Sequence, residues 1–225
     1  MTSEARKLMT VAVVGGTGKE GSGLALRWAN SGYLVLIGSR DAARAAAKAA
    51  ELNEILGDNV INGMSNVDAA AQADMVVLSV PYAAHRGILE SIKDAVQGKI
   101  LVDVTVPVQP PKISTVHVPA GDAACLEAQE LVGDGVRVVA AFQNVSHTHL
   151  KDLQHNVHCD VLVCGDDADA KQEVFHLVEA VAGMRPIDAG PLANAVAAEA
   201  LTPVLLYINK RYKVHGSGIR ITGLE

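Results

Sequence analysis

The chain has 225 residues and a formal net charge of −6, and 49% of its residues are hydrophobic while only 3% are aromatic. This length suits one large domain or a domain with a small extension. The acidic charge, with no basic cluster longer than Lys210-Arg211, argues against a nucleic-acid partner. The N-terminus lacks the apolar core of a signal peptide and the apolar runs are only as long as strands, so no membrane segment is expected.

The first predicted unit is a strand, a glycine-rich turn and a helix. The strand Val11-Val14 is followed directly by Gly16, Gly18 and Gly21, which form the pattern G-x-G-x-x-G. In a dinucleotide site the first glycine allows a tight turn, the second lets the pyrophosphate approach, and the third lets the helix lie close to the strand. Thr17 can add a hydroxyl donor at the helix N-terminus, which favours anions. A plain strand-to-helix turn is the alternative interpretation.

The next strand, Leu34-Gly38, indicates which dinucleotide is bound. An NAD enzyme usually places Asp or Glu there, whereas this chain has Ser39 and Arg40. A hydroxyl and a guanidinium both donate hydrogen bonds, which favours the 2′-phosphate of NADP(H). Arg44, one helical turn later, can face the same phosphate, and Asp41 is expected to cap the following helix. Alternatively, Arg40 and Arg44 are solvated surface charges.

The rest of the chain alternates strands with helices and predicts a Rossmann-type α/β fold, a doubly wound, mostly parallel sheet with a small C-terminal helical extension. Residues 1–140 are expected to form the NADP-binding domain, and residues 141–225 a smaller part that completes the sheet and the pocket for the second substrate. The expected strands are Val60-Asn62, Met75-Val80, Lys99-Val104, Val136-Ala140, Asp160-Cys164 and Arg185-Asp188, and the expected helices are Ala42-Leu56, Asn66-Ala73, Ala84-Val96, Asp122-Leu131, Ala168-Ala182 and Leu192-Tyr212.

Two valine-proline corners close neighbouring strands of this sheet. Ligands of open parallel sheets lie outside the carboxyl ends of the strands. Val80 with Pro81, and Val106 with Pro107, can therefore form an apolar wall against a nicotinamide ring. The alternative is that the prolines only terminate strands.

Residues after the strand Val136-Ala140 are candidates for contact with a second substrate. Gln143, Val145 and His147 follow that strand and should reach the same edge of the sheet, although they can also be ordinary loop residues. No catalytic side chain is predicted, because a hydride passes directly between two stacked rings. The glycines of the C-terminal segment HGSGIRITG suggest a segment folded over a second ligand.

Histidines and cysteines gather in the second half, but their spacing does not indicate a metal site. His147, His149, His155 and His158 lack the spacing of a zinc frame, so no metal is expected. The odd cysteine count without framework spacing predicts a reducing, cytoplasmic setting, with the thiols acting as small buried hydrophobes; the cysteines are Cys125, Cys159 and Cys164. The acids of Gly165-Asp166-Asp167 are expected to cap a helix.

The final predicted helix is apolar around most of its circumference and contains Pro203, which should interrupt and kink it. A helix of this kind must be covered on all sides. We therefore expect a homodimer that packs this helix against a partner. The alternative is that the helix is central in its own C-terminal part.

The chain resembles the NADPH-dependent reductases of the deazaflavin coenzyme F420 over nearly its whole length. The resemblance rests on VGGTGKEGSGLALRWANSGYLVLIGSR, NVDAAAQADMVVLSVP, VLVCGDD and MRPIDAGPLANAVAAEALTPVLLYI. It implies NADP(H) as cofactor and coenzyme F420 as the small-molecule electron acceptor. It further implies that Lys19 and Glu20, with Thr17 and Gly18, border the pyrophosphate. It also supports the 2′-phosphate and nicotinamide residues chosen above.

This chain departs from the family pattern at two positions. Family examples carry a histidine where this chain has Gln143, and a basic residue near Val196. Because the coenzyme is an anion, a lost positive charge weakens its binding unless His147 or Lys210 compensates. Three functions therefore stay open: hydride transfer between NADPH and coenzyme F420, reduction of another flavin, a ferric chelate or a small imine or carbonyl, and a non-enzymatic NADP(H) sensor.

Overall fold

The computed structural model describes residues 8–224, which form one eight-stranded sheet flanked by helices. This confirms the predicted Rossmann-type α/β class. The elements in chain order are β1 Val11–Val14, α1 Lys19–Asn30, β2 Val35–Ser39, α2 Ala42–Leu56, β3 Ile61–Ser65, α3 Asn66–Gln72, β4 Met75–Leu78, α4 Tyr82–Ile92, β5 Ile100–Asp103, α5 Ala124–Val132, β6 Arg137–Ala140, η1 His147–His149, β7 Cys159–Gly165, α6 Ala168–Glu179, β8 Met184–Asp188, η2 Leu192–Asn194 and α7 Ala195–Tyr212.

The strand order β3-β2-β1-β4-β5-β6-β7-β8 places β1 at the centre of the N-terminal half. It pairs in parallel with β2 on one side and with β4 on the other. The chain therefore reverses its direction of progress across the sheet between β1 and β4, and ligands of such sheets bind at the carboxyl edge of this switch point. The pairing of β6 with β7 is antiparallel, so β7 and β8 extend the same sheet beyond residue 140.

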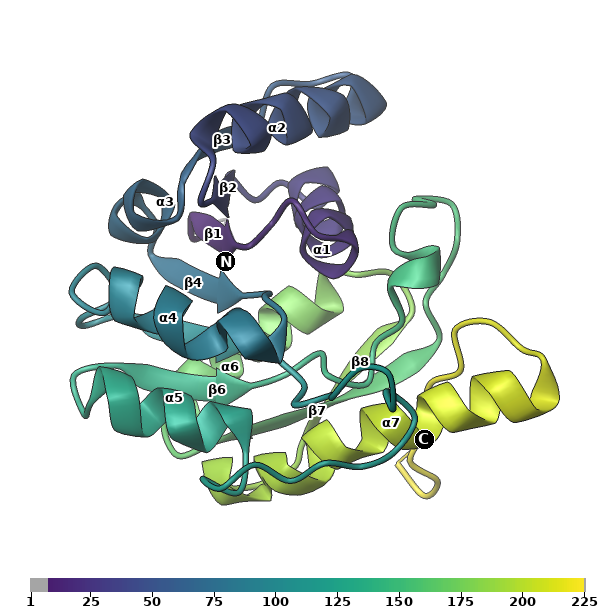
Figure 1. Ribbon diagram of the computed structural model, residues 1–225. Coiled ribbons are helices and arrows are strands. Elements are labelled where there is room, and N and C mark those ends of the chain that lie inside the picture. The colour runs from purple at the N-terminus through teal and green to yellow at the C-terminus, as the bar shows by residue number, and fades with distance from the viewer. Residues whose placement is uncertain (1–7, 225) are drawn as a thin grey trace, which may run out of the picture.

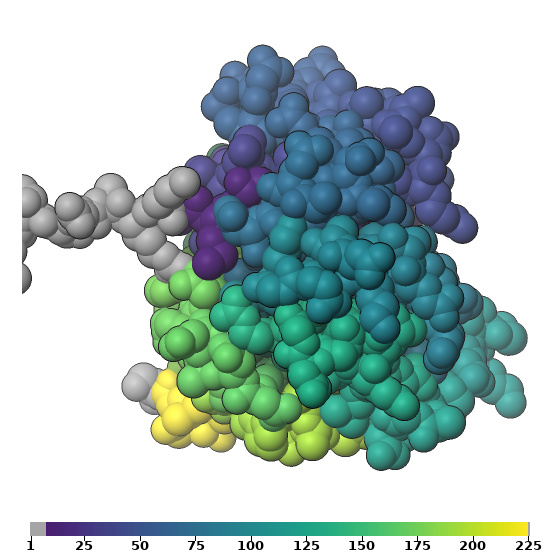
Figure 2. Space-filling model, turned by 90° about the vertical axis from the view of Figure 1, so that its left-hand side faces the viewer, coloured from purple at the N-terminus to yellow at the C-terminus, as the bar shows by residue number. Residues whose placement is uncertain are grey.

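Helices cover both faces of the sheet, as Figure 1 shows. Buried residues of α1, α2 and α6 form one hydrophobic cluster. Those of α3, α4, α5 and the start of α7 form a second cluster on the opposite face. In Figure 2 the purple start of the described chain lies directly against the green part of the C-terminal half. Whether the two halves are separate domains, as the boundary at 140/141 supposes, stays a prediction.

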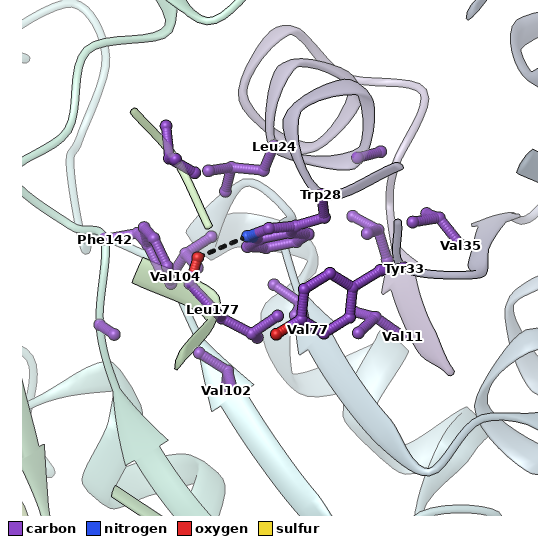
Figure 3. Close-up of a cluster of buried hydrophobic side chains, with 14 of the residues drawn as sticks. Val11, Leu24, Trp28, Tyr33, Val35, Val77, Val102, Val104, Phe142 and Leu177 are labelled. Carbon is purple, nitrogen blue, oxygen red and sulfur yellow. Dashed lines mark hydrogen bonds between the residues drawn. The ribbon is translucent and has the colours of Figure 1, made fainter. Parts of the chain in front are cut away.

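Trp28 on α1 is the largest fully buried side chain and joins the two halves of the chain. Its indole nitrogen donates a hydrogen bond to the carbonyl oxygen of Leu177 on α6, at 2.9 Å. Its ring meets Phe142 edge-on, with ring centroids 5.6 Å apart. Figure 3 shows the indole among Leu24, Phe142 and Leu177. This packing fixes α1, and hence the glycine turn before it, against the segment that follows β6.

The final helix differs from the prediction, because α7 runs from Ala195 to Tyr212 without an interruption at Pro203. The proline is buried, and so is Leu205 one half-turn later. Glu199 is also buried and accepts hydrogen bonds from the backbone N–H groups of Ala124 and Cys125 at the start of α5. Packing on both sides of Pro203 therefore holds the helix together although the proline cannot donate a backbone hydrogen bond.

By length and composition alone, the segment Leu192–Tyr212 is apolar enough to cross a membrane. The central helix of a globular domain passes the same test. Here the hydrogen bonds of Glu199 attach the segment to α5, and about a third of its most apolar stretch is buried inside the protein.

Candidate functional site

The glycine turn between β1 and α1 shows why each glycine is required. A Cβ on Gly16 would lie 2.7 Å from the carbonyl oxygen of Val13, and a Cβ on Gly21 would lie 3.0 Å from the Cα of Gly16. A side chain at either position would therefore clash with the packing of the turn or of the helix on the strand. A Cβ on Gly18 would meet only one atom within 4 Å, the carbonyl oxygen of Gly15, at 3.5 Å. The space beside Gly18 is thus open to a ligand, as the dinucleotide interpretation requires.

The helix that follows this turn begins without a side-chain cap, since Gly18 is its N-cap residue. Its first N–H groups and the positive end of its dipole therefore face the turn. Beside the turn lies a cleft of about 240 Å³. It brings together most of the predicted cofactor residues, and its full lining is Gly15, Thr17, Gly18, Ser39, Arg40, Arg44, Asn66, Ser79, Val80, Pro81, Ala84 and Ile88.

The residues predicted to select NADP(H) lie at one end of this cleft. Asp41 caps α2 by accepting hydrogen bonds from the backbone N–H groups of Ala43 and Arg44, as expected. Ser39 is buried, and its hydroxyl accepts a hydrogen bond from the N–H of Asp41 at 3.2 Å. The side chains of Arg40 and Arg44 are exposed, and within residues 8–224 neither forms a hydrogen bond or an ion pair. Two guanidinium groups that have no partner among residues 8–224 can bind a phosphate at the cleft.

Two polar residues of the cleft lining were missed by sequence reasoning. Asn66, the first residue of α3, accepts a hydrogen bond from the N–H of Gly15 with its side-chain oxygen, at 3.3 Å. Ser79 follows β4, and its carbonyl oxygen would lie 2.4 Å from a Cβ on Gly15. Both residues directly follow strands that flank β1 or β2, so the rule that ligands lie at strand carboxyl ends could have found them.

A second cavity of about 310 Å³ lies on the other side of the α1 N-terminus. It brings together the predicted substrate residues Gln143, Val145 and His147, and Val106 from the apolar wall. The side chains from α7 and the C-terminal segment complete it, and only that segment was foreseen from its glycines. Its lining is Glu20, Val104, Val106, Phe142, Gln143, Asn144, Val145, Ser146, His147, Thr148, Thr202, Leu205, Leu206, Asn209, Val214, His215, Gly216 and Ser217.

Glu20 lines this second cavity and not the cleft in which its resemblance-based role would place it. It lies in the first turn of α1, where a step of two residues from Gly18 turns the side chain to another face of the helix. Its Oε1 atom is buried without a hydrogen-bond partner, and burial raises the pKa of the carboxyl from 4.5 to about 8. Lys19 is exposed and lines neither space.

The predicted substrate residues are held in different ways. Gln143 is buried and donates a hydrogen bond from its amide nitrogen to the carbonyl oxygen of Asp103, at 2.7 Å. Val145 is buried as well. The pKa of His147 is lowered by its partial burial and by the positive charge of Lys19, which favours the neutral imidazole.

Arg27 ties the loop that carries His147 to α1. This arginine is buried, and its guanidinium donates hydrogen bonds to the carbonyl oxygens of residues His149, Leu150, Asp152 and His155. Four carbonyl groups of one loop are therefore satisfied by one side chain of the helix that starts at the glycine turn. The second cavity is thus built on the same helix as the cofactor cleft.

Asp160 holds the C-terminal segment that borders the second cavity. It is fully buried on β7 and accepts hydrogen bonds from Arg185 on β8 and from Arg220 and the N–H of Ile221 in that segment. Hydrogen bonds from Arg185 contribute most to lowering its pKa from 3.8 to about 2. These contacts anchor the C-terminal segment just after residues 214–217, which line the cavity.

A larger cavity, of about 640 Å³, lies between α4 and α5 and contains none of the predicted site residues. It is lined in part by Tyr82, whose hydroxyl donates a hydrogen bond to Glu127, and by His85, which bonds Asp103 at 2.6 Å. Its lining joins neither the glycine turn nor the carboxyl edge near β1, so size does not identify the site in this fold.

The four predicted histidines do not act together. His147 lines the second cavity, whereas His149 and His155 stack on one another with ring centroids 4.2 Å apart. Within residues 8–224 no three His, Cys, Asp or Glu side chains are grouped so that they could hold a metal ion. The three cysteines are buried free thiols.

Comparisons with known proteins point to one family. Residues 10–107 match the family model described as NADP oxidoreductase, coenzyme F420-dependent. The F420-dependent NADP reductase of Methanothermobacter thermautotrophicus is 44% identical over 96% of each chain, and that of Methanocaldococcus jannaschii is 40% identical over 96% of this chain and all of its own. A crystal structure from Arthrobacter sp. FB24, provisionally described as an F420-dependent NADP reductase, superimposes with a TM-score of 0.80 at 27% identity, covering 95% of this chain and 99% of its own.

Proposed function

This chain belongs to the family of coenzyme F420-dependent NADP oxidoreductases, and from that membership we propose that it transfers a hydride between NADP(H) and coenzyme F420. The observation that carries the proposal is the position of the two spaces on one helix. Gly18 at the start of α1 lines the cleft, and Glu20, two residues later, lines the second cavity. A donor ring and an acceptor ring bound in the two spaces would therefore meet beside the glycine turn.

Apart from Lys19 and Glu20, the predicted residues then have tasks that their positions support. Gly16 and Gly21 shape the turn, and Thr17 and Gly18 face the pyrophosphate. Ser39, Arg40 and Arg44 bind the 2′-phosphate. Val80 and Pro81 from the cleft, and Val106 from the second cavity, flank the nicotinamide, since they follow the neighbouring strands β4 and β5. Gln143, Val145 and His147 contact the acceptor. The protein needs mainly to hold the rings together and to exclude water.

A second candidate is reduction of another flavin, a ferric chelate or a small imine or carbonyl. One observation favours it: the residues that line the second cavity include no lysine or arginine, although coenzyme F420 is an anion. Val196, near which the resemblance implies a basic residue, packs against the second hydrophobic cluster. Lys210 is exposed and does not line the cavity, so His147 and His215 are the basic residues left to compensate.

The loss of NADPH absorbance tests these functions directly. The purified protein is mixed with NADPH and either oxidised coenzyme F420, free flavin, ferric citrate or a cyclic imine. We expect turnover with coenzyme F420 and at most traces with the others. Turnover with another acceptor alone would favour the second candidate, and tight NADPH binding without turnover would leave the non-enzymatic sensor.

We further propose a homodimer in a reducing, cytoplasmic setting. The buried, free thiols suit such a setting. The outer face of α7 carries Val204, 44% exposed, and Tyr207, 57% exposed, one helical turn apart, and nothing in residues 8–224 covers them. A second copy packed on this face would cover both.

Light scattering at micromolar concentration should therefore give the mass of a dimer, and Val204→Glu should give a monomer, because a charge at the centre of an apolar interface is costly. Val67→Glu on α3 is the matched control, since that valine is also 44% exposed. A monomeric wild-type protein would contradict the proposed dimer.

A further inference from the structure

Three unpartnered oxygen atoms belong to residues that line the second cavity. Among residues 8–224, four buried side-chain atoms have no hydrogen-bond partner, and three of them, on Glu20, Gln143 and Asn144, belong to residues that line this cavity. The fourth is the hydroxyl of Thr105, which follows β5. Buried polar atoms are nearly always paired in native proteins. Three such residues on the lining of one cavity mark it as a place where a ligand can supply missing partners.

The two amide groups can only accept hydrogen bonds from that ligand. The side-chain nitrogen of Gln143 donates to the carbonyl oxygen of Asp103, and that of Asn144 donates to the carbonyl oxygen of Asp160, each at 2.7 Å. Because carbonyl oxygens accept only, these contacts fix which end of each amide is nitrogen. The free oxygens therefore suit N–H groups, such as those at the edge of a pyrimidine-like ring.

Glu20 differs from the two amides because its carboxyl can carry a proton. Within the described residues it has no hydrogen bond and no ion pair, and apolar side chains such as Val104 and Phe142 line the cavity with it. Burial alone raises its pKa to about 8, so the carboxyl is neutral at pH 7 and is a donor. The other titratable groups on the lining are His147 and His215. Partial burial and the charge of Lys19, next to Glu20 on α1, lower the pKa of His147.

We propose that Glu20 is a catalytic acid that supplies the proton accompanying the hydride. The inference rests on the proposed function. NADPH gives up its hydride, a new C–H bond forms on the acceptor ring, and NADP⁺ is left. The O–H bond of Glu20 breaks as an N–H bond forms on a nitrogen of the same conjugated ring. The carboxylate then regains a proton from water through the open cavity. In the opposite direction the carboxylate takes that proton from the reduced ring.

Glu20→Gln tests this role, since the amide keeps the size of the side chain but cannot transfer a proton. With coenzyme F420 as acceptor, we expect kcat at pH 7 to fall about 100-fold, which is the lower end of what a general acid contributes. The wild-type rate should fall as pH rises past about 8, and the variant should lack this limb. The Kd for NADPH, measured by fluorescence, should not change. Glu127→Gln, a half-buried glutamate outside the cavity, is the control and should keep the wild-type profile.

An infrared difference spectrum supplies a readout without turnover. The wild-type spectrum minus that of Glu20→Gln should contain the C=O stretch of a protonated carboxyl at pH 7 and lose it above about pH 8, since the band of Glu199, whose pKa burial raises to about 7, cancels in this difference. The inference is overturned if the variant keeps the alkaline limb of the rate profile, or if that band disappears near the ordinary glutamate pKa. If the wild type reduces only another acceptor, the pH–rate profiles of wild type and Glu20→Gln are measured with that acceptor, and the same difference is expected. A protein that reduces no acceptor would overturn the inference and the proposed function together.

Discussion

Replacing Asp160 by asparagine should lower the free energy of unfolding by roughly 3 kcal/mol at pH 7, the lower end for breaking a buried ion pair. The carboxylate is fully buried and accepts hydrogen bonds from two arginines and a backbone N–H. An asparagine would turn an amide nitrogen towards one of these donors and would remove the negative charge. The lower end applies because Arg185 and Arg220 are partly exposed and can be rehydrated.

The effect of Asp160→Asn should depend on pH in a defined direction. The folded pKa of about 2 lies below the unfolded value of 3.8, so the stabilisation is fully present above the unfolded value. It is lost as the pH falls through this interval, because the folded carboxyl is then protonated as well. Urea unfolding at pH 7, 5, 4 and 3 should therefore show a constant difference between variant and wild type down to about pH 5, and a smaller one at pH 3.

A surface ion pair provides the control for this measurement. Arg86 and Glu90 pair on α4 with both side chains largely exposed, so Glu90→Gln should change stability by less than about 1 kcal/mol. Because Arg220 and Ile221 anchor the segment beside the second cavity, Asp160→Asn should also raise KM for the acceptor more than KM for NADPH. An unchanged midpoint of urea unfolding would mean that Asp160 does not hold the C-terminal segment.

The features predicted correctly from the sequence are local ones. The glycine turn and the cap by Asp41 depend on residues within a few positions of each other, so their spacing carries the information. The alternation of strands and helices fixes the parallel order in the same way. The predicted interruption at Pro203 is wrong, because it was inferred from the proline alone and not from the tertiary contacts that Glu199 makes with α5.

The second cavity needed information that no local pattern holds. Its wall combines the first turn of α1, the segment after β6 and the far end of α7, which are brought together only by packing. The position of Glu20 shows the limit most clearly: its neighbour Gly18 lines the cleft, and only the direction of the side chain on the helix separates the two sites. Likewise, Asp160 and Arg220 are 60 residues apart in the chain, and the sequence around neither residue predicts their ion pair.

Replacing Arg40 by aspartate should weaken NADPH binding by about 100-fold, which is about 2.7 kcal/mol. Arg40 lines the cofactor cleft with Ser39 and Arg44, and within residues 8–224 its guanidinium has no partner to lose. The substitution would therefore leave the fold intact, because the side chain is exposed. It would remove a charge-assisted contact with the 2′-phosphate and place a carboxylate near that phosphate. Arg44 would still face the phosphate, which limits the loss.

NADH separates a specific contact from a general effect of charge, since it lacks the 2′-phosphate. Its Kd should change less than threefold in Arg40→Asp, because an aspartate can accept hydrogen bonds from ribose hydroxyls. Lys93→Asp, just past the end of α4 far from Pro81, makes the same change in net charge and should leave both affinities unchanged. Titration calorimetry at two salt concentrations measures all three proteins. If Arg40→Asp weakened NADPH and NADH equally, Arg40 would support the shape of the cleft and would not recognise the phosphate.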